Sequence, residues 1–139
     1  MQRFSPVLIF LLFITSCSKK DVPNFDRDIV YVSDFKLDPV TGDTVYAIYM
    51  PNAFTPNGNG INDFYLVYSN TIDRDKFSMK IYDRYQSPLF TSTDINKGWS
   101  GKVAGQGYYA PTGLYTVELF VNDTSGEAHH YLYKAMLMK

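Results

Sequence analysis

Residues 51–64 read Pro-Asn-Ala-Phe-Thr-Pro-Asn-Gly-Asn-Gly-Ile-Asn-Asp-Phe, and this polar stretch separates two apolar segments. Its prolines fix φ, while its glycines and asparagines tolerate positive φ. A flexible linker would not need this combination, so we predict one ordered compound turn. The flanking segments, residues 45–50 and 64–68, are predicted to be strands, and the second is apolar on both faces, as in a buried strand.

Farther along the chain, apolar and polar side chains alternate with the period of two that is typical of strands. Phe77, Met79 and Ile81 alternate with polar residues, which predicts a strand that faces the core on one side. Residues 69–75 before it read as a polar loop. Further strands are predicted at residues 88–93, 114–121 and 131–138. Residues 122–126 contain the turn residues of a hairpin, so the last two strands should be antiparallel neighbours.

The overall composition agrees with a strand-rich fold. The chain of 139 residues contains 12 Tyr and 10 Phe and shows little helical periodicity. Its length suits one domain with a modest core. About seven short strands with turn signals between them predict an all-β fold, an immunoglobulin-like antiparallel β-sandwich. A net charge of −1 gives no basic patch, so we expect no nucleic acid partner.

Four ordered motifs resemble those of a known family: residues 51–64, residues 77–85, Gly-Trp-Ser-Gly at 98–101 and Ala-Pro-Thr-Gly-Leu-Tyr at 110–115. Over roughly residues 48–139 the chain resembles the gliding motility-associated C-terminal domain, the type B sorting domain of the type IX secretion system. The structural motif residues are Pro51, Asn52, Phe54, Thr55, Pro56, Asn57, Gly58, Gly60, Asn62, Asp63, Trp99, Gly101, Pro111, Gly113 and Tyr115.

The chain departs from the family's motifs at three places. Asn59 and Ser100 each stand where the family usually has Asp, and residues 86–88 contain no Gly where the family usually has a Gly-containing hairpin turn. The resemblance implies that residues 51–139 form a sandwich domain that the type IX secretion translocon, or its PorP/SprF-type outer-membrane protein, recognises as an address. It also implies a role in secretion or surface attachment that is linked to gliding motility.

The first 16 residues are predicted to be a lipoprotein signal peptide. Arg3 precedes an unbroken apolar run at residues 7–14, which is far shorter than the ~20 residues of a transmembrane helix. Residues 14–17, Ile-Thr-Ser-Cys, resemble a bacterial lipobox, and Cys17 is the only cysteine of the chain. We therefore expect Cys17 to be lipidated and to anchor the protein to the membrane. The alternative is an ordinary signal peptide with an incidental cysteine.

A lipid anchor at Cys17 would place the protein on the outer membrane, at the cell surface or on the periplasmic face. Residues 17–28 are expected to be an extended tether and residues 29–50 an N-terminal β-hairpin. Only about thirty residues separate the anchor from the sandwich domain. We therefore expect the domain to have little cargo ahead of it, which leaves surface adhesion or an accessory role in secretion as further functions.

Calcium is the one cofactor that the motifs suggest. Asn57, Asn59, Asn62 and Asp63 place oxygen atoms around a sharp turn, as calcium loops do. Asp63 is the only charged residue among them, so the affinity should be low. The favoured alternative is that these side chains cap their own turn through hydrogen bonds.

Several other residues are candidates for binding. Trp99 lies between two glycines and is expected to fill the core, because large rings in tight turns usually pack inward. If exposed, it could stack on sugars together with Tyr108 and Tyr109, which makes a carbohydrate-binding module the alternative function. His129 and His130 are adjacent and should point to opposite faces of a strand, so they cannot easily chelate one ion. Both are expected to be surface or edge residues.

An enzymatic function is not expected. The sequence contains no G-x-S-x-G elbow, no H-E-x-x-H motif and no phosphate-binding glycine loop. Its carboxylates show no spacing that would mark an acid–base pair. We therefore predict a non-catalytic protein.

Overall fold

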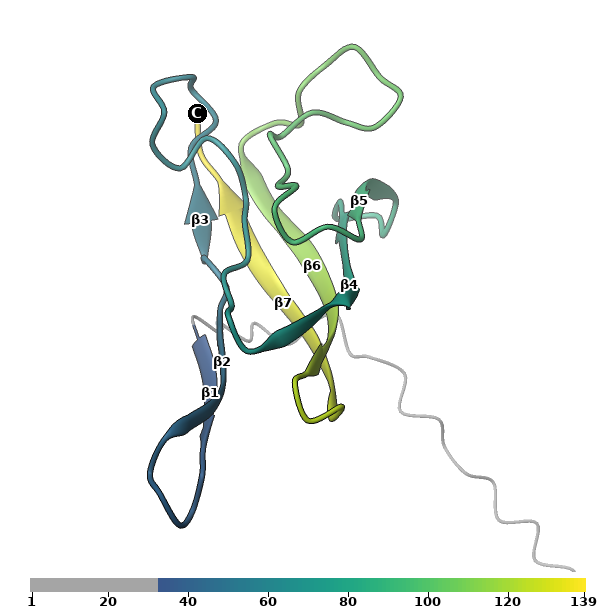
Figure 1. Ribbon diagram of the computed structural model, residues 1–139. Helices are drawn as coiled ribbons and strands as arrows, with labels where there is room; N and C mark the ends of the chain where they lie inside the picture. The colour runs from purple at the N-terminus through teal and green to yellow at the C-terminus, as the bar shows by residue number, and fades with distance from the viewer. Residues whose placement is uncertain (1–32) are drawn as a thin grey trace, which may run out of the picture.

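The computed structural model describes residues 33–139, which form seven strands in two sheets (Figure 1). The strands are β1 (Ser33–Leu37), β2 (Thr44–Tyr49), β3 (Ala53–Phe54), β4 (Ile72–Tyr82), β5 (Pro88–Ser92), β6 (Gly113–Asp123) and β7 (Ala128–Leu137). The larger sheet has the order β3-β7-β6-β4-β5, and β1 and β2 form the smaller sheet. Within this part of the chain, only the β3–β7 pair is parallel. The predicted all-β fold, an antiparallel sandwich of about seven strands, is confirmed, with the β3–β7 pair as a parallel exception.

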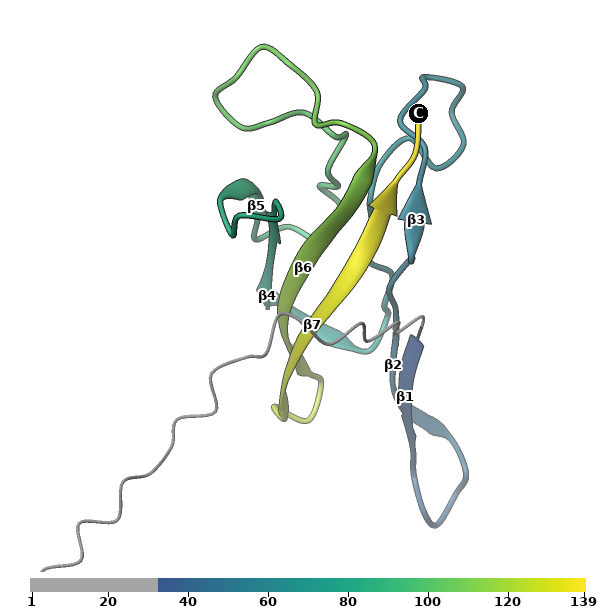
Figure 2. The same ribbon diagram turned by 180° about the vertical axis from the view of Figure 1, so that it is seen from behind.

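β6 and β7 form the centre of the larger sheet and run side by side along its length (Figure 2). β6 covers the strand predicted at residues 114–121, and its alternating residues Tyr115, Val117, Leu119 and Val121 are all buried. The hairpin turn between the two strands is also where the sequence placed it, and Gly126 adopts a φ of 90° there. β7 begins at Ala128, three residues earlier than predicted, so both histidines lie within the strand.

β4 begins earlier than the sequence indicated. Residues 69–75 were predicted to be a polar loop, but Ile72 and Asp73 already pair with the end of β6. The register then shifts between Asp73 and Ser78, and the charged residues between them are exposed. The loop prediction is therefore wrong from Ile72 onward, because an irregular strand with exposed charges has the composition of a loop.

The second layer covers the larger sheet with β2 and less regular segments. Tyr46, Ile48 and Met50 point into the core from β2 and the residue that follows it. Residues 64–68 join this layer through two isolated bridges, Tyr68 with Tyr49 and Tyr65 with Trp99. The prediction of a fully buried strand at 64–68 is wrong. The segment pairs with other backbone only at Tyr65 and Tyr68, so it forms no continuous strand.

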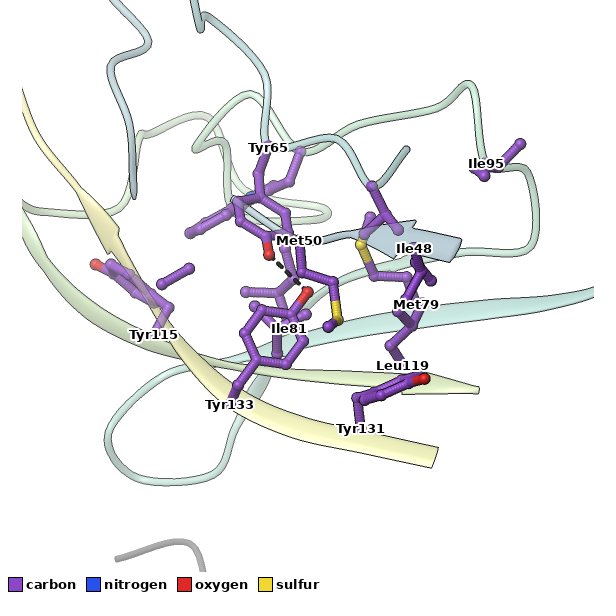
Figure 3. Packing of buried hydrophobic residues seen from close by; sticks show 14 of the residues in the cluster. Ile48, Met50, Tyr65, Met79, Ile81, Ile95, Tyr115, Leu119, Tyr131 and Tyr133 are labelled. Carbon is purple, nitrogen blue, oxygen red and sulfur yellow. Dashed lines mark hydrogen bonds between the residues drawn. The ribbon is translucent and has the colours of Figure 1, made fainter. Parts of the chain in front are cut away.

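The inner faces of the two layers form one core, in which aromatic side chains are prominent (Figure 3). Tyr65 and Tyr133 point toward each other from opposite layers, and the Tyr65 hydroxyl donates a 2.6 Å hydrogen bond to the Tyr133 hydroxyl. Burial raises the pKa of both hydroxyls, so both stay protonated and neutral. Each therefore remains the hydrogen-bond partner of the other within the core. Each large apolar side chain in this core contributes roughly 1.5–3 kcal/mol by its removal from water.

The N-terminal hairpin pairs β1 with β2 in antiparallel register. The Asp38 carboxylate accepts hydrogen bonds from the amides of Val40 and Thr41 and so orders the turn between the strands. The predicted signal peptide, the lipidation site at Cys17, the tether and residues 29–32 of the predicted hairpin lie outside the described residues. Residues 33–139 include no helix of the length and apolarity that spanning a membrane requires.

Candidate functional site

The signature segment, residues 51–64, begins as the edge of the larger sheet and ends as a loop beside the C-terminus (Figures 1 and 2). β3 runs parallel to β7, and the Met136 amide donates to the Asn52 carbonyl oxygen at 2.8 Å. The Met138 amide donates to the Phe54 carbonyl oxygen at 3.0 Å. Pro51, which has no N–H, lies just before this short edge strand, where a missing donor is tolerated.

Asp63 organises the loop that follows β3. One carboxylate oxygen, Oδ1, accepts hydrogen bonds from the amides of Gly58 at 2.6 Å and Asn57 at 2.9 Å. The other, Oδ2, accepts from the Gly60 amide at 2.6 Å. The hydrogen bonds from Gly58 and Gly60 lower the pKa of the Asp63 carboxyl, because they stabilise its charged form. The loop is therefore one ordered compound turn, as predicted.

The asparagines of the loop are also engaged with its backbone. Asn57 Oδ1 accepts from the Asn59 amide at 3.0 Å, and Asn59 Oδ1 accepts from the Ile61 amide at 2.9 Å. Asn62 adopts a left-handed φ of 52°, and its carbonyl oxygen accepts from the Thr55 amide at 2.8 Å. These contacts match the hydrogen-bonded alternative. A calcium ion at this loop would share the oxygens of Asn57, Asn59 and Asp63 with the backbone amides that already donate to them.

Trp99 is 1% exposed and fills the core as predicted. Its ring lies 5.4 Å from the ring of Phe54 and 5.0 Å from that of Tyr115. Its Nε1 donates a 2.7 Å hydrogen bond to the Lys102 carbonyl oxygen, so the polar atom of the indole keeps a partner. A ring enclosed in this way cannot stack on a sugar, so the carbohydrate-binding role that relied on Trp99 is wrong.

The glycines on either side of Trp99 are required by close packing. A Cβ at Gly98 would lie 2.7 Å from the Tyr65 carbonyl oxygen. At Gly101, φ is +81° and a Cβ would lie 3.0 Å from Leu137 and 3.3 Å from Pro56. The Gly-Trp-Ser-Gly motif therefore ties the signature loop to the last strand of the sheet.

The Pro-Thr-Gly-Leu-Tyr motif fixes the entry into β6. The Tyr115 hydroxyl donates a 2.6 Å hydrogen bond to the Pro111 carbonyl oxygen, four residues upstream. Gly113 is the first residue of β6 and pairs with Leu137. A tyrosine whose hydroxyl donates to a backbone carbonyl a few residues upstream is known as a tyrosine corner in immunoglobulin-like sandwiches.

A groove of about 270 Å³ runs along β3 and combines signature residues with exposed aromatic rings. Its lining is formed by Tyr49, Pro51, Asn52, Ala53, Phe54, Thr55, Asn62, Phe64, Tyr68 and Met138. Phe64 and Tyr68 are 53% and 55% exposed. Large exposed rings beside a sheet edge are typical of interaction sites. We refer to these lining residues as the signature groove, and it is the candidate functional site.

The aromatic residues of the signature groove were not predicted from the sequence, because residues 64–68 are apolar on both faces and were predicted to form a buried strand. Only Tyr65 and Val67 of this segment are buried. Strict alternation would have placed Phe64 and Tyr68 on the other face, and that was the signal available in the sequence.

Tyr108 and Tyr109 are both exposed but lie in different surroundings. Tyr108 lines a second groove of about 610 Å³ together with Arg84 and Tyr85. The Tyr109 ring instead lies 5.3 Å from the Lys102 ammonium group. The two tyrosines that the sequence predicted as binding residues therefore lie in different surroundings.

The two histidines point to opposite faces of β7, as predicted, but they differ in exposure. His130 stacks on Phe120 with ring centroids 4.0 Å apart and is exposed. His129 stacks on Tyr46 at 4.1 Å, and its side chain is 15% exposed. His129 is therefore only partly exposed, because Tyr46 of the N-terminal hairpin covers one face of its ring.

The family of the chain was established by comparison with known proteins. A model described as the CHU_C type IX secretion signal domain matches residues 48–134. The match begins within β2 and ends within β7, so it covers most of the sandwich and leaves out β1. A comparison with curated proteins finds no match. On the basis of the family match, this chain belongs to the CHU_C type IX secretion signal domain family.

Proposed function

We propose that the sandwich domain is an address read by the type IX secretion machinery, on a non-catalytic lipoprotein of the cell envelope. The observation that carries this proposal is the match of residues 48–134 to a type IX secretion signal domain. The motifs of the signature loop and of the Trp99 turn meet at one end of the molecule, where Gly101 packs beside Pro56 and Leu137. An address needs such a rigid surface more than it needs a catalytic pocket.

The proposed contact surface is the signature groove. Phe64 and Tyr68 offer apolar area that a partner would bury, and aromatic side chains of this kind often dominate binding energy. β3 is a short edge strand, so its outer backbone groups are available to a strand of the partner. The partner would be the type IX translocon or a PorP/SprF-type outer-membrane protein.

The groove proposal is tested by the double variant Phe64→Ser and Tyr68→Ser, with Tyr85→Ser as the matched control. All three side chains are exposed, so the variants should fold normally. We expect the double variant to lose surface delivery in cells and the control to keep it. Equal delivery of the two proteins would contradict the assignment of the groove.

The proposal includes an anchor on the outer membrane at Cys17, at the cell surface or on the periplasmic face, where the domain would serve secretion or attachment linked to gliding motility. Cys17→Ala removes the thiol to which the lipid would be attached. We expect this variant to leave the membrane fraction when cells are separated into soluble and membrane parts. Continued membrane association of the variant would contradict the lipoprotein assignment.

A second candidate function is carbohydrate binding at the other groove. Tyr85 and Tyr108 line this groove beside the Arg84 guanidinium, and the guanidinium lies 4.7 Å from the Tyr85 ring centroid. Exposed rings next to a hydrogen-bond donor suit the face and hydroxyl groups of a sugar. This function predicts saturable binding of a cell-surface polysaccharide that is lost in Tyr108→Ala and kept in Tyr109→Ala. Identical binding by both variants would contradict it.

A further inference from the structure

Three side chains with different chemistry meet where the β6–β7 hairpin turns. Asp123, Glu127 and His129 each direct a ligand atom to the same place, and these atoms all lie within 4.8 Å of one another. We propose that this cluster, which we call the hairpin cluster, binds a divalent transition-metal ion of the zinc type. It lies away from the signature groove and shares no residue with it.

The donor set and its spacing fit such an ion. One imidazole nitrogen and two carboxylate oxygens are common ligands of zinc. His129 Nε2 lies 3.5 Å from Asp123 Oδ2, which is long for a hydrogen bond. Two ligand atoms on a tetrahedral zinc, each about 2.0–2.1 Å from the metal, are separated by about 3.3–3.4 Å. The observed separation is therefore close to that of two ligands of one ion.

The orientation of Asp123 is fixed before any metal binds. Its side chain is 5% exposed, and its Oδ1 accepts hydrogen bonds from the Ser125 amide at 2.9 Å and the Ser125 hydroxyl at 2.6 Å. Oδ1 also accepts from the Glu127 amide at 2.8 Å. These three donors all use one oxygen, so Oδ2 remains directed at His129. Ligands held by surrounding hydrogen bonds are typical of metal sites.

The ring of His129 is held in the same way by its neighbours. It lies parallel to the Tyr46 ring, with 4.1 Å between centroids and 4° between planes. The Tyr131 ring lies on the next inward position of the strand at 6.3 Å. This stacking keeps Nε2 pointing toward Asp123, so little side-chain entropy would be lost when a metal binds.

The hairpin cluster differs from the signature loop in the way its carboxylate is used. In the signature loop, both oxygens of Asp63 accept backbone amides. In the hairpin cluster, the amides and the hydroxyl occupy only one oxygen of Asp123, and the other faces an imidazole. The first arrangement orders a loop, whereas the second leaves a ligand atom for a cation.

A lysine competes for the third ligand. Lys36 Nζ lies 2.6 Å from Glu127 Oε2, and both side chains are more than half exposed, Glu127 at 52%. A surface ion pair of this kind is weak, so Glu127 can rotate from the ammonium group toward a metal. Asp73, Arg74 and Asp75 line the same shallow depression as Asp123, so its carboxylates outnumber its one cation.

Calorimetric titration with Zn²⁺ alone tests the proposal, using full-length protein in detergent with Cys17→Ser throughout to remove the free thiol. We expect saturable binding of one ion per chain. His129→Ala should weaken binding by at least about tenfold. The matched control is His130→Ala, whose imidazole lies on the opposite face beside Glu118, and it should leave the affinity within about twofold.

Two further variants keep the test decisive if loss of the Tyr46 stack impairs folding of His129→Ala. Glu127→Gln changes an exposed side chain and should also weaken binding at least about tenfold. Lys36→Met removes the competing ammonium group and should strengthen binding. The proposal is overturned if Zn²⁺ gives no saturable binding, if Glu127→Gln binds like the parent protein, or if His130→Ala loses as much affinity as His129→Ala.

Discussion

At the scale of single residues, Trp99 joins both layers of the sandwich, because it packs on Phe54 and Tyr115 and bridges to Tyr65. Trp99→Ala would leave a large cavity and an orphaned carbonyl at Lys102, so we expect a loss of about 3–5 kcal/mol in the free energy of unfolding. Urea denaturation followed by circular dichroism measures this loss. Tyr108→Ala, which truncates an exposed ring, should change the free energy of unfolding by less than about 0.5 kcal/mol. A similar loss in both variants would contradict the core assignment of Trp99.

Gln86 shows how this chain accommodates the absence of glycine in the turn after β4. It adopts a left-handed φ of 65°, which is unfavourable for a residue with a Cβ. The Asp83 carboxylate holds the turn by accepting from the amides of Tyr85 and Ser87, both at 2.8 Å. The turn therefore keeps a geometry suited to glycine without having one.

Gln86→Gly should stabilise the protein by up to about 1 kcal/mol, because relief of the left-handed strain outweighs the added freedom of the unfolded chain. The melting temperature and the denaturant midpoint both report this gain. Ser87→Gly is the control: φ at Ser87 is not positive, so glycine there should only destabilise. A destabilised Gln86→Gly protein would show that the side chain has a role beyond the turn.

At the scale of elements, the signature loop should make the free energy of unfolding depend on pH in the acidic range. The folded-state pKa of Asp63 lies below its usual value, chiefly because the Gly58 and Gly60 amides bond to the charged form. An unfolded Asp titrates near pH ~3.9, so this contribution is complete above that pH and is lost as the pH falls through the lower folded value.

Asp63→Asn removes this titration. Melting temperatures measured from pH 6 down to pH 2 should fall less steeply for this variant than for the parent protein. Asp43→Asn, an exposed carboxylate in the turn between β1 and β2, is the control and should keep the parental slope. Parallel curves for Asp63→Asn and the parent would mean that the loop's hydrogen bonds contribute nothing to acid stability.

The elements that the sequence predicted well are those whose neighbours are close in the chain. β6 and β7 alternate regularly and are joined by a short turn, so pattern and pairing agree. The prediction for residues 64–68 was wrong because the exposure of this segment depends on distant partners. Tyr49 and Trp99 each contact it at a single point. The partial burial of His129 could not be predicted for the same reason, since the ring that covers it belongs to Tyr46, which is distant in the chain.

Part of the candidate site was also within reach of the sequence. The order of the signature loop followed from its prolines, glycines and asparagines, and the inward position of Trp99 followed from its flanking glycines. The signature groove could not be predicted as a whole, because its lining brings together β3, the exposed rings of Phe64 and Tyr68, and Met138 from separate parts of the chain. Parallel pairing between segments at opposite ends of the domain leaves no local pattern.

At the scale of the whole molecule, the family match and the structure divide the described chain into two parts. Residues 48–134 carry the four motifs and most of the larger sheet, whereas β1 lies outside the match. β1 pairs with β2 through the backbone and also contacts β7 and the β6–β7 turn through side chains. Asp34 Oδ2 accepts a 2.7 Å hydrogen bond from the Tyr131 hydroxyl, and Lys36 pairs with Glu127. β1 therefore covers the edge of β2 and is held beside the β6–β7 hairpin.

The central claim is that the sandwich domain acts as an address for type IX secretion. Protease shaving of intact cells, with and without a working type IX translocon, tests it most directly when the remaining full-length protein is detected in each strain. We predict that the domain is cleaved only in cells with a working translocon. Equal cleavage in both strains, or protection in both, would contradict the account.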